Sequence, residues 1–413
     1  MTGDAPGRRV YMLTETYRPE IGGGERQAAL LSAGLVQRGC PVMLVVRRSR
    51  RGLPWREAEG AVEIRRLPPT GPGRLRKWLL IIPALLQLVV KRREYDIVLV
   101  SGFRLLGISA VLAAIVTGRP TILKADSSGE MSGEYFRTGL RSLGLSPEGA
   151  LAKFFLSRRN ALLRRADRFV CLSGEMRDEF VAVGVPADRC VTIPNGVDTE
   201  RFHPAAPDER LALRRQLSLP AGPVVIYTGR LVRYKGLPEL LEAWRVIAVE
   251  HPEACLALVG EGGGDQQACE EELRQGVEIH SLTASVRFTG AVDNVEDWLR
   301  AADIFVFPTH DEAFGLSLVE AMACGLPAVS TRVGGLVDIV RDGENAVAVP
   351  PGSPARIVDA LRSLLDNPGY RERLGSAARE NAMAHHDIDV VCDAYQQLLA
   401  DLSSDHLGKR DDG

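Results

Sequence analysis

Short apolar segments rich in β-branched residues alternate with longer segments of helical periodicity along most of the chain. In the first half we predict strands at Val10–Glu15, Pro41–Val46, Val62–Arg66, Ile97–Ser101, Thr121–Ala125, Arg168–Leu172 and Val191–Ile193. Several of these are almost continuous apolar runs, which are typical of strands buried on both faces of a sheet. Helical segments between them include Glu25–Arg38, Leu75–Arg92, Arg104–Thr117 and Ser173–Val183.

The same rhythm begins again in the second half, after an interruption. We predict strands at Val224–Thr228, Leu256–Val259, Val286–Thr289, Ile304–Pro308, Ala328–Ser330 and Ala346–Val349. The interruption starts with the turn Pro194-Asn195-Gly196 and continues as the polar segment His203–Pro223, which we interpret as a linker. Helical periodicity dominates Pro354–Leu402, and we expect the polar tail Ser403–Gly413 to fray.

Strands that alternate with helices in this way predict an α/β protein with parallel sheets and right-handed crossovers. We expect two doubly wound domains, residues 1–200 and 201–385, and a C-terminal helix in residues 386–413 that packs back toward the N-terminal domain. Ligands of such sheets bind beyond the carboxyl ends of the strands. With two sheets facing each other, the natural active site is a deep cleft between the domains.

The composition is that of a folded globular protein, but its small net charge is the sum of two oppositely charged halves. The chain has 413 residues, 45% apolar and 25% charged, which excludes a disordered chain, a collagen and a small disulfide scaffold. The net charge is −2. Residues 1–200 carry 31 Lys and Arg against 20 Asp and Glu, giving +11, while residues 201–413 carry 20 against 33, giving −13. The basic half is therefore expected to meet an anionic partner.

We expect neither a signal peptide nor a membrane span. The apolar run Val10–Leu13 is far too short for a secretory segment, and the most apolar window, Trp78–Val90, is shorter than the roughly 20 residues of a span. The seven cysteines are scattered and form no C-x-x-C pair, which fits a reducing cytosol and offers no thiolate zinc site. These features predict a cytoplasmic location.

The most specific motif begins at Glu312 and follows the predicted strand Ile304–Pro308. Gly315 permits a close backbone approach, and a helix is expected to begin near Leu316. The N-terminus of a helix presents free N–H groups and the positive end of its dipole, which suit a phosphate group. Taken alone, the segment is equally consistent with a helix cap followed by a solvated Glu320.

This segment resembles the E-x7-E signature, here Glu312 and Glu320, of the family 4 retaining glycosyltransferases, also called glycosyl transferases group 1. That family has the GT-B fold of two Rossmann-like domains. Further family motifs occur in the expected order along most of the chain. They are Gly22-Gly23-Gly24-Glu25, Pro194-Asn195-Gly196-Val197-Asp198 with Phe202 and Pro204, Gly229-Arg230-Leu231 with Lys235-Gly236, Val259-Gly260-Glu261-Gly262, and Gly334-Gly335. One such match is weak, whereas the ordered set is highly specific.

The resemblance implies roles for the charged residues of the second half. Arg230 and Lys235 would reach the diphosphate of a nucleotide-sugar donor and neutralise the charge that develops on the leaving group. Glu312 would contact the hydroxyls of the donor sugar, and Glu320 the ribose of the nucleotide. The alternative for Arg230 and Lys235 is a solvated surface pair.

The resemblance also implies that backbone groups bind the donor. The N–H groups of Phe314, Gly315 and Leu316 would meet sugar and phosphate oxygens. The loop formed by Gly22, Gly23 and Gly24 would approach the diphosphate from the other domain, although a plain strand-to-helix turn is its alternative. Selection of base and sugar would depend on loops around three further residues, Glu261, Val292 and His310.

The chain departs from the family pattern at one position. Many members carry a His just after the strand that here is Thr121–Ala125, whereas this chain continues with Asp126 and contains no His there. Asp126 or Lys124 could contact the donor sugar or the acceptor instead. The alternative is that Asp126 only caps a loop.

Three other motifs do not support a different function. The glycines from Gly260 to Gly264 lack the spacing of a dinucleotide fingerprint. Asp387-Ile-Asp389 has the form of a metal-binding D-x-D, but it follows a helical segment near the C-terminus. We expect the neighbouring His385 and His386 to lie at the surface. No metal site is required, because Arg230 and Lys235 can supply the positive charge.

The segment Arg74–Arg93 is basic at both ends and apolar between them, and Arg158, Arg159, Arg164 and Arg165 add positive charge. One interpretation is monotopic attachment of the N-terminal domain to an anionic membrane, beside a lipid-linked acceptor. The other is an ordinary crossover helix that covers the sheet and has solvated ends. The sequence does not decide between them.

These observations lead us to expect a retaining, metal-independent glycosyltransferase of the hexosyltransferase type. Its donor would be a UDP- or GDP-linked sugar and its acceptor a hydroxyl of a sugar or lipid-linked molecule, in cell-surface polysaccharide or glycolipid assembly. We expect no cofactor and no nucleic-acid partner. A sugar-nucleotide epimerase of the same fold and a non-catalytic sugar-nucleotide-binding protein are the alternatives, although the latter would be expected to lose Glu312, Arg230 or Lys235.

Overall fold

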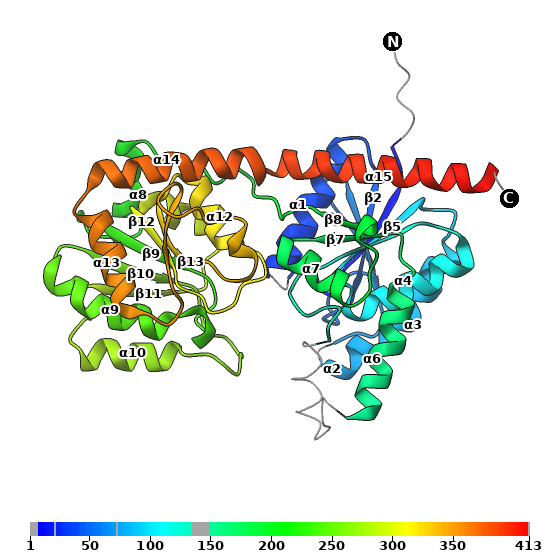
Figure 1. The fold of residues 1–413 in the computed structure, drawn as a ribbon, viewed down its shortest axis with the longest axis horizontal. Coiled ribbons are helices and arrows are strands. Elements are labelled where there is room, and N and C mark those ends of the chain that lie inside the picture. Colours follow the sequence, from blue (N-terminus) through cyan, green and yellow to red (C-terminus); the bar gives the residue numbers. More distant parts are fainter. Residues whose placement is uncertain (1–6, 20–21, 72, 134–148, 412–413) are drawn as a thin grey trace, which may run out of the picture. The chain divides into compact units, whose positions relative to one another are not determined.

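The computed structural model describes residues 7–19, 22–71, 73–133 and 149–411 (Figure 1). The chain forms two compact units. Unit 1 comprises residues 1–196 and 388–413, and unit 2 comprises residues 197–387. The chain therefore leaves unit 1 after Gly196, builds unit 2, and returns to unit 1 at Ile388.

Unit 1 is built on an eight-stranded sheet in the order β3-β4-β2-β1-β5-β6-β7-β8. Neighbouring strands are parallel except β3 and β4, which are antiparallel. The strands are β1 (Val10–Leu13), β2 (Val42–Arg47), β3 (Arg56–Glu59), β4 (Val62–Leu67), β5 (Ile97–Ser101), β6 (Thr121–Lys124), β7 (Arg168–Cys171) and β8 (Cys190–Thr192). Every residue of β1 and β5 is buried, which explains their continuous apolar runs.

Unit 2 contains a six-stranded parallel sheet in the order β11-β10-β9-β12-β13-β14. Its strands are β9 (Val224–Thr228), β10 (Cys255–Val259), β11 (Val286–Gly290), β12 (Ile304–Phe307), β13 (Ala328–Thr331) and β14 (Ala346–Val349). The two sheets confirm the predicted pair of doubly wound α/β folds.

Each sheet reverses its strand order at one position. In unit 2 the chain places β10 and β11 on one side of β9. It places β12, β13 and β14 on the other side, so the strand order reverses between β9 and β12. In unit 1 the reversal lies between β1 and β5. At such a switch point the loops that follow the two strands diverge, and ligands of open α/β sheets bind there.

Helices connect the strands in both units (Figure 1). Those of unit 1 are α1 (Gly23–Gln37), α2 (Arg74–Leu79), α3 (Ile81–Val90), α4 (Phe103–Thr117), α6 (Ala150–Leu163), α7 (Gly174–Ala182) and α15 (Ile388–Asp411). Those of unit 2 are α8 (Pro207–Gln216), α9 (Leu237–Glu250), α10 (Glu270–Ile279), α11 (Val295–Ala301), α12 (Leu316–Ala323), α13 (Pro354–Leu365) and α14 (Pro368–His385). Short 3₁₀ turns are η1 (Ala187–Arg189), η2 (Arg233–Lys235) and η3 (Gly334–Val337).

Several elements differ from those that the sequence predicts. The expected single helix Leu75–Arg92 is two helices, α2 and α3, which meet at Leu80. The expected linker His203–Pro223 contains α8, whose start has Pro207 at its first position and two acidic residues in its first turn. The tail that was expected to fray continues as α15 to Asp411.

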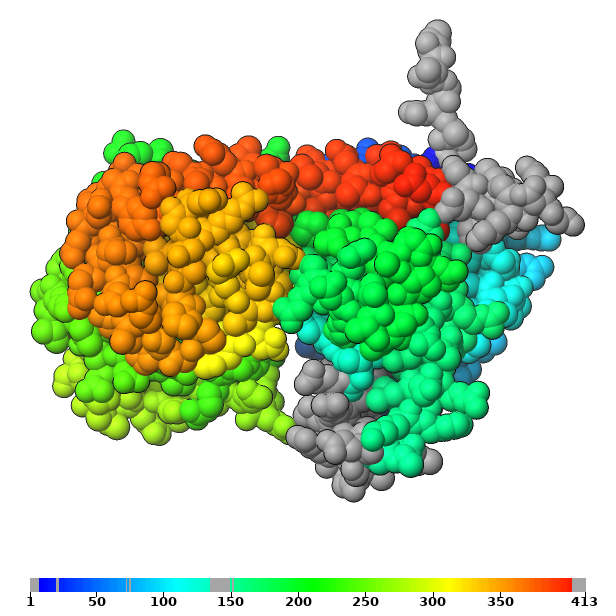
Figure 2. All heavy atoms as spheres, in the orientation of Figure 1, coloured from blue at the N-terminus to red at the C-terminus, as the bar shows by residue number. Residues whose placement is uncertain are grey.

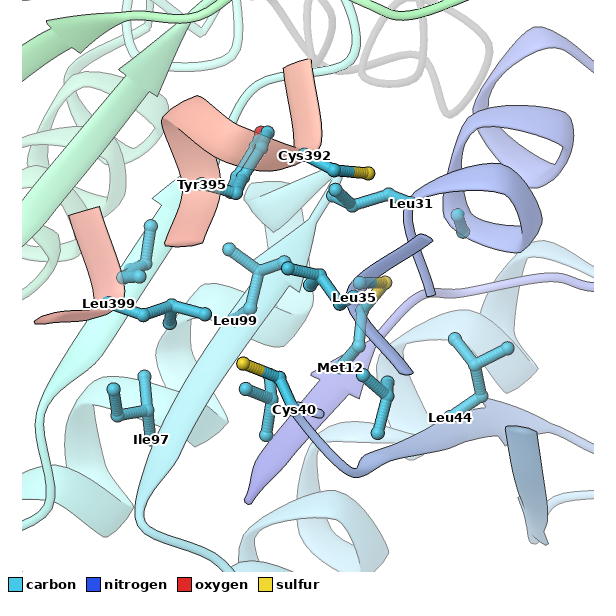
Figure 3. Close-up of a cluster of buried hydrophobic side chains, with 14 of the residues drawn as sticks. Met12, Leu31, Leu35, Cys40, Leu44, Ile97, Leu99, Cys392, Tyr395 and Leu399 are labelled. Carbon is cyan, nitrogen blue, oxygen red and sulfur yellow. The ribbon is translucent and has the colours of Figure 1, made fainter. Parts of the chain in front are cut away.

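The last helix completes the core of unit 1. Figure 3 shows Cys392 and Tyr395 of α15 near Leu31 and Leu35 of α1, in a cluster that extends to the strands of the sheet. Gly34 on α1 allows this approach, because a Cβ atom there would lie 2.4 Å from the Cys392 Sγ atom. No helix of the described part of the chain is long and apolar enough to cross a membrane.

Candidate functional site

The loop that follows β9 lies against the end of β12, at the switch point of unit 2. Gly236 makes this approach possible, because it has a left-handed backbone and a Cβ atom there would lie 2.0 Å from the Pro308 carbonyl oxygen. The loop is also tied to β12 through Tyr234, whose carbonyl oxygen accepts a hydrogen bond from the His310 N–H at 2.8 Å. The two loops at the switch point are therefore held side by side.

Lys235 and Glu312 form an ion pair across these two loops. The Lys235 Nζ atom lies 2.6 Å from the Glu312 Oε2 atom, and both side chains are mostly buried, with 12% and 17% of their surface exposed. The ammonium group also lies 5.1 Å from the ring centre of Tyr234 and 5.3 Å from that of Phe307. A cation and a carboxylate are thus placed together where a ligand of this sheet is expected.

The backbone around Glu312 is fixed from two directions. Its carbonyl oxygen accepts a hydrogen bond from the Gly335 N–H at 2.9 Å, and its Oε1 atom accepts one from the Phe314 N–H at 3.4 Å. Gly334 packs so closely that a Cβ atom there would lie 2.0 Å from the Glu312 carbonyl oxygen. The Gly334-Gly335 motif is therefore explained by close packing against the Glu312 segment.

Helix α12 begins directly after this segment. Gly315 has a φ angle of 100° and precedes the first helical residue, Leu316, as expected. Glu320 lies inside the helix and is buried, which excludes the solvated side chain of the alternative interpretation. The hydrogen bond to Glu296 raises the pKa of Arg201, and the charge of Glu320 adds a smaller contribution. Burial, followed by the charge of Glu320, raises the pKa of the Cys324 thiol.

Arg230 occupies a more open position than Lys235. Its side chain is 60% exposed and forms an ion pair with Asp265 at 2.6 Å, and it also contacts the Tyr234 hydroxyl. Its carbonyl oxygen accepts a hydrogen bond from the Tyr227 hydroxyl at 2.8 Å. Burial, followed by the charge of Glu312, raises the pKa of Tyr227 well above its usual value, so Tyr227 stays a neutral donor.

Glu261 and Val292 lie on the β10 and β11 side of the switch point. Glu261 is exposed, and its carbonyl oxygen accepts a hydrogen bond from the Leu231 N–H at 3.0 Å. Val292 is half-buried and lines an open cavity of about 600 Å³ beside β11, together with Arg274 and Phe288. In the described residues this cavity does not include the Lys235 and Glu312 side chains.

In unit 1 the glycine loop lies beside Asp126. Gly22 precedes α1, Gly23 has open space around it, and a Cβ atom on Gly24 would lie 3.3 Å from the Asp126 Oδ2 atom. Gly102, directly after β5, would place a Cβ atom 3.0 Å from the same oxygen. The loop and Asp126, which are far apart in the sequence, thus meet at the switch point of unit 1.

Polar partners hold Asp126 in place. The Lys124 Nζ atom lies 2.5 Å from its Oδ1 atom, and the Ser101 hydroxyl donates to its carboxylate at 2.9 Å. The backbone N–H of Asp126 donates to the Glu130 Oε1 atom at 3.0 Å. Asp126 therefore has more polar partners than a residue that only caps a loop would need.

Glu130 is fully buried next to this group. Its burial raises its pKa to about 7, the nearby Arg104 and Arg159 lower it, and the charge of Asp126 raises it. Arg104 lies 3.6 Å away on α4, and the guanidinium of Arg159 donates to the Glu130 carbonyl oxygen at 2.8 Å. A buried carboxyl group with a raised pKa therefore lies next to Asp126.

Two family models match consecutive parts of the chain. The model described as glycosyltransferase family 4 matches residues 21–201, and the model described as glycosyl transferases group 1 matches residues 209–381. A D-inositol 3-phosphate glycosyltransferase of Acidothermus cellulolyticus is 30% identical over 428 aligned residues, covering 95% of this chain and 91% of that protein. The chain belongs to the family 4, group 1 glycosyltransferases.

Other relatives of this glycosyltransferase align over shorter regions. A D-inositol 3-phosphate glycosyltransferase of Streptomyces bingchenggensis is 35% identical over 250 residues, which is 59% of this chain and 53% of that protein. The alignment with that relative thus spans about half of its length.

Solved structures show the same fold at low sequence identity. Anabaena HepE in complex with UDP and glucose has a TM-score of 0.74 at 22% identity, covering 96% of this chain and 100% of that chain. Sucrose-phosphate synthase of Thermosynechococcus elongatus has a TM-score of 0.79 at 22% identity, covering 96% and 99%. The glycosyltransferase therefore has the predicted GT-B fold.

Within unit 2, the glycosyltransferase motifs found in the sequence converge only in part. The structure brings Lys235, Glu312 and the start of α12 together, but it directs Arg230 onto Asp265. Within unit 1, the glycine loop and Asp126 converge.

The prediction of surface histidines is wrong for one of the two. His385 is exposed, whereas His386 is buried, with its ring 5.6 Å from that of Phe314. Burial, with a smaller contribution from the charge of His385, lowers the pKa of His386 to about 4. The sequence did not reveal this burial, because the two histidines lie at the end of a helix of mixed polarity.

The D-x-D segment takes part in structural contacts. Asp387 accepts a hydrogen bond from the Thr199 hydroxyl in unit 2, and Asp389 forms an ion pair with Arg38 at 2.9 Å in unit 1. In the described residues no group of three or more His, Cys, Asp or Glu side chains is arranged to hold a metal ion. All seven cysteines lie in the described part of the chain, where they are buried and form no disulfide bond.

Sequence reasoning missed several members of these groups. Tyr227 is hidden within the apolar run of β9, and Ser101 is the last residue of β5. Ser101 could have been found, because β5 and β6 are neighbouring parallel strands whose carboxyl ends meet at one edge. Glu130 gives no such signal, since its position depends on the fold of the loop after β6.

Proposed function

We propose that this glycosyltransferase transfers a sugar from a nucleotide-diphosphate sugar to a hydroxyl acceptor, with retention of the anomeric configuration. The observation that carries the proposal is the Lys235–Glu312 ion pair at the switch point of unit 2, beside the N-terminus of α12. A diphosphate needs positive charge and backbone N–H groups, and a sugar needs a hydrogen-bond acceptor. This position offers all three.

Lys235 is the residue that we assign to the diphosphate of the donor. On binding, its ammonium would exchange the Glu312 carboxylate for phosphate oxygens and would stabilise the negative charge of the leaving group. Arg230 would add a second positive charge after releasing Asp265. Because these side chains supply the charge, we expect turnover to persist in the presence of EDTA.

When Lys235 leaves the ion pair to bind the diphosphate, the Glu312 carboxylate would become available to the donor sugar. Its carboxylate would accept hydrogen bonds from donor-sugar hydroxyls, while the N–H groups of Phe314, Gly315 and Leu316 would reach sugar and phosphate oxygens. Glu320 is the proposed ribose contact. Its burial within α12 keeps its orientation fixed.

The acceptor side of the reaction is assigned to unit 1. Asp126 stands where many family members have a His, and Lys124 and Ser101 fix its carboxylate. The proposed role of Asp126 is to orient the acceptor or the donor sugar. In the retaining reaction that we propose, a phosphate oxygen of the leaving diphosphate takes the proton of the attacking hydroxyl, and the new glycosidic bond forms on the same face.

Comparisons suggest which substrates to test first. Because the structure of HepE contains UDP, we would test UDP-sugars before GDP-sugars as donors. The name of the Acidothermus relative indicates an inositol phosphate as its acceptor. We would therefore test acceptors that carry both a hydroxyl and a phosphate group first. Lipid-linked sugars of polysaccharide or glycolipid assembly are the second acceptor class.

A two-stage experiment tests the proposal. A thermal-shift screen of UDP- and GDP-sugars identifies the donor, since a ligand present at 100 times its dissociation constant adds about 2.7 kcal/mol of stability. The release of nucleoside diphosphate is then measured with and without acceptors. Release that requires an acceptor supports glycosyl transfer, with the anomer of the product read by NMR.

The same measurements separate the two alternatives. An epimerase would convert the donor sugar to its epimer without any acceptor. A non-catalytic binding protein would bind the donor and release no diphosphate with any acceptor class. Either result would overturn the proposed reaction.

A further inference from the structure

Exposed apolar side chains are concentrated on four helices of unit 1. Among the described residues, nine of the eighteen large apolar side chains that are strongly exposed lie on α2, α3, α4 and α6. They are Trp78, Leu79, Ile82, Leu86, Val90, Ile115, Val116, Phe154 and Phe155. We call these nine residues the apolar patch. Such a concentration marks an interaction surface more often than a random distribution does.

Helix α3 carries a continuous exposed stripe. Ile82, Leu86 and Val90 are spaced by four residues and therefore share one face, and they are 61%, 58% and 73% exposed. The opposite face buries Ala84 and Leu88. A crossover helix that only covers a sheet would bury its apolar face and expose a polar one. Helix α3 instead has apolar residues on both faces.

The four helices form one contiguous layer. The Ser109 hydroxyl of α4 donates to the Ile81 carbonyl oxygen of α3 at 2.8 Å. The Trp78 ring of α2 lies 5.7 Å from the Phe155 ring of α6. The Arg159 guanidinium of α6 donates to the Arg104 carbonyl oxygen of α4. Figure 2 shows the side chains of α6 at the surface of unit 1.

The charge of this layer has a single sign. Residues 74–93, 103–119 and 149–166, which contain the four helices, hold 13 Lys and Arg residues and no Asp or Glu. Exposed members are Arg76, Arg92, Arg93, Lys153, Arg158 and Arg165. Acidic partners come from outside these segments, as where Glu94 pairs with Lys91 at 2.5 Å. Arg158 lies over the Phe154 ring at 5.1 Å, so charge and apolar surface adjoin.

Exposed apolar side chains on helices that carry basic residues and no Asp or Glu match one class of surface best. An anionic lipid bilayer offers an apolar interior for Trp, Phe and Leu and negative headgroups for Lys and Arg. We propose that the apolar patch and its basic neighbours dock unit 1 onto an anionic membrane, without crossing it. The docking does not depend on the proposed reaction.

Vesicle flotation of the full chain tests the proposal. The wild-type protein is mixed with vesicles of phosphatidylcholine alone or with a third of phosphatidylglycerol. We expect flotation with the anionic vesicles, several-fold less with neutral ones, and a decrease as salt rises. No flotation with anionic vesicles, or equal flotation with both compositions at every salt concentration, would overturn the proposal.

Matched variants locate the surface. Leu86→Gln with Val90→Gln removes part of the α3 stripe, and Arg92→Gln with Arg93→Gln removes two positive charges. Loss of the two positive charges is expected to weaken binding about thirtyfold, since each basic residue near the surface contributes about 1 kcal/mol. The apolar pair is expected to weaken binding at least about tenfold, since full burial of one Leu or Val side chain contributes about 1.5 kcal/mol or more. The control pair, Val249→Gln with Ile279→Gln, changes side chains of unit 2 that are 81% and 75% exposed, and should bind as the wild type does.

Two readouts guard against misinterpretation. Thermal unfolding and nucleotide-sugar binding are measured for each variant, so that loss of folding or of the donor site is distinguished from loss of docking. Sedimentation velocity tests a second copy of the chain as the occupant of the patch. A dimer that the Leu86→Gln and Val90→Gln pair abolishes, or equal weakening by the control pair, would overturn the membrane proposal.

Discussion

At the residue scale, Lys235 and Glu312 neutralise each other at a position where the proposed ligand is itself highly charged. The 2.6 Å ion pair would have to open for a diphosphate to reach the ammonium. The carboxylate both competes with phosphate for Lys235 and repels it. The two residues should therefore have opposite effects on the binding of a nucleoside diphosphate that carries no sugar.

Glu312→Gln tests this opposition. It removes one negative charge but keeps the size of the side chain, so we expect UDP to bind as tightly as in the wild type or more tightly. Turnover should still fall about 10- to 100-fold in kcat/KM, because a charge-assisted hydrogen bond to the donor sugar becomes a neutral one. Calorimetry and steady-state kinetics measure the two effects. A variant with weaker UDP binding and normal turnover would refute the assignment.

Glu130 makes a prediction about stability and pH. Its pKa is about 7 in the folded chain and lies near 4.5 when exposed, so between these values the folded state keeps a proton that the unfolded state releases. The wild-type free energy of unfolding therefore falls as pH rises through this window. Glu130→Gln should remove up to about 3 kcal/mol of this pH dependence, as measured by denaturant titrations from pH 4.5 to 8.

The groups that face Glu130 are Arg104 on α4, Arg159 on α6 and Asp126 after β6. The matched control is Glu63→Gln, which changes an exposed carboxylate on β4. The control should keep the wild-type pH dependence. If the curves of wild type and Glu130→Gln run parallel, the raised pKa of Glu130 is disproved.

At the scale of elements, buried parallel strands were predictable and polar elements were not. Strands β5, β9 and β14 have the bounds that the apolar runs predict. Strand β3 escaped prediction, because Arg56–Glu59 is polar and pairs only at an edge of the sheet. Helix α8 was hidden for the same reason, since it buries little apart from Leu213 and Arg214.

In the candidate site, too, the residues next to a buried strand were predictable, whereas contacts that depend on the tertiary fold were not. Glu312, Gly315 and the start of α12 could be placed from the sequence, because they follow a buried strand and a turn. The Lys235–Glu312 contact needs the switch point between β9 and β12, and that depends on the order of strands in the sheet. The buried states of Glu130 and His386 depend on loop packing, which no local pattern encodes.

Helix α15 depends on a close approach to α1 that a single glycine permits. Gly34→Ala would place a Cβ atom 2.4 Å from the Cys392 Sγ atom, so we expect unit 1 to lose about 1 to 3 kcal/mol of stability in denaturant unfolding. Adding Cys392→Ala should restore part of the loss, because the obstructing sulfur is gone. Ala33→Ser, on the exposed face of α1, is the control.

The opposite outcome has a clear meaning. In an exposed helix, replacing Gly by Ala stabilises by up to about 1 kcal/mol. Stabilisation by Gly34→Ala would therefore show that α15 does not pack against α1 at this position.

At the scale of the whole molecule, the division of charge follows the two units. Unit 1, residues 1–196 with 388–413, carries 33 Lys and Arg against 24 Asp and Glu, giving +9, while unit 2, residues 197–387, carries 18 against 29, giving −11. The return of α15 makes unit 1 less basic than residues 1–200 alone. Unit 2 is acidic, so its affinity for an anionic donor has to come from local charges such as Lys235.

The binding of UDP to Lys235→Met, measured by isothermal titration calorimetry, tests this central claim most directly. The change removes the local positive charge and leaves Glu312 beside the phosphate, so we expect UDP to bind about 10- to 100-fold more weakly. Lys153→Met on α6 is the matched control and should bind as the wild type does. Equal affinity of wild type and Lys235→Met would contradict the placement of the donor diphosphate at the switch point of unit 2.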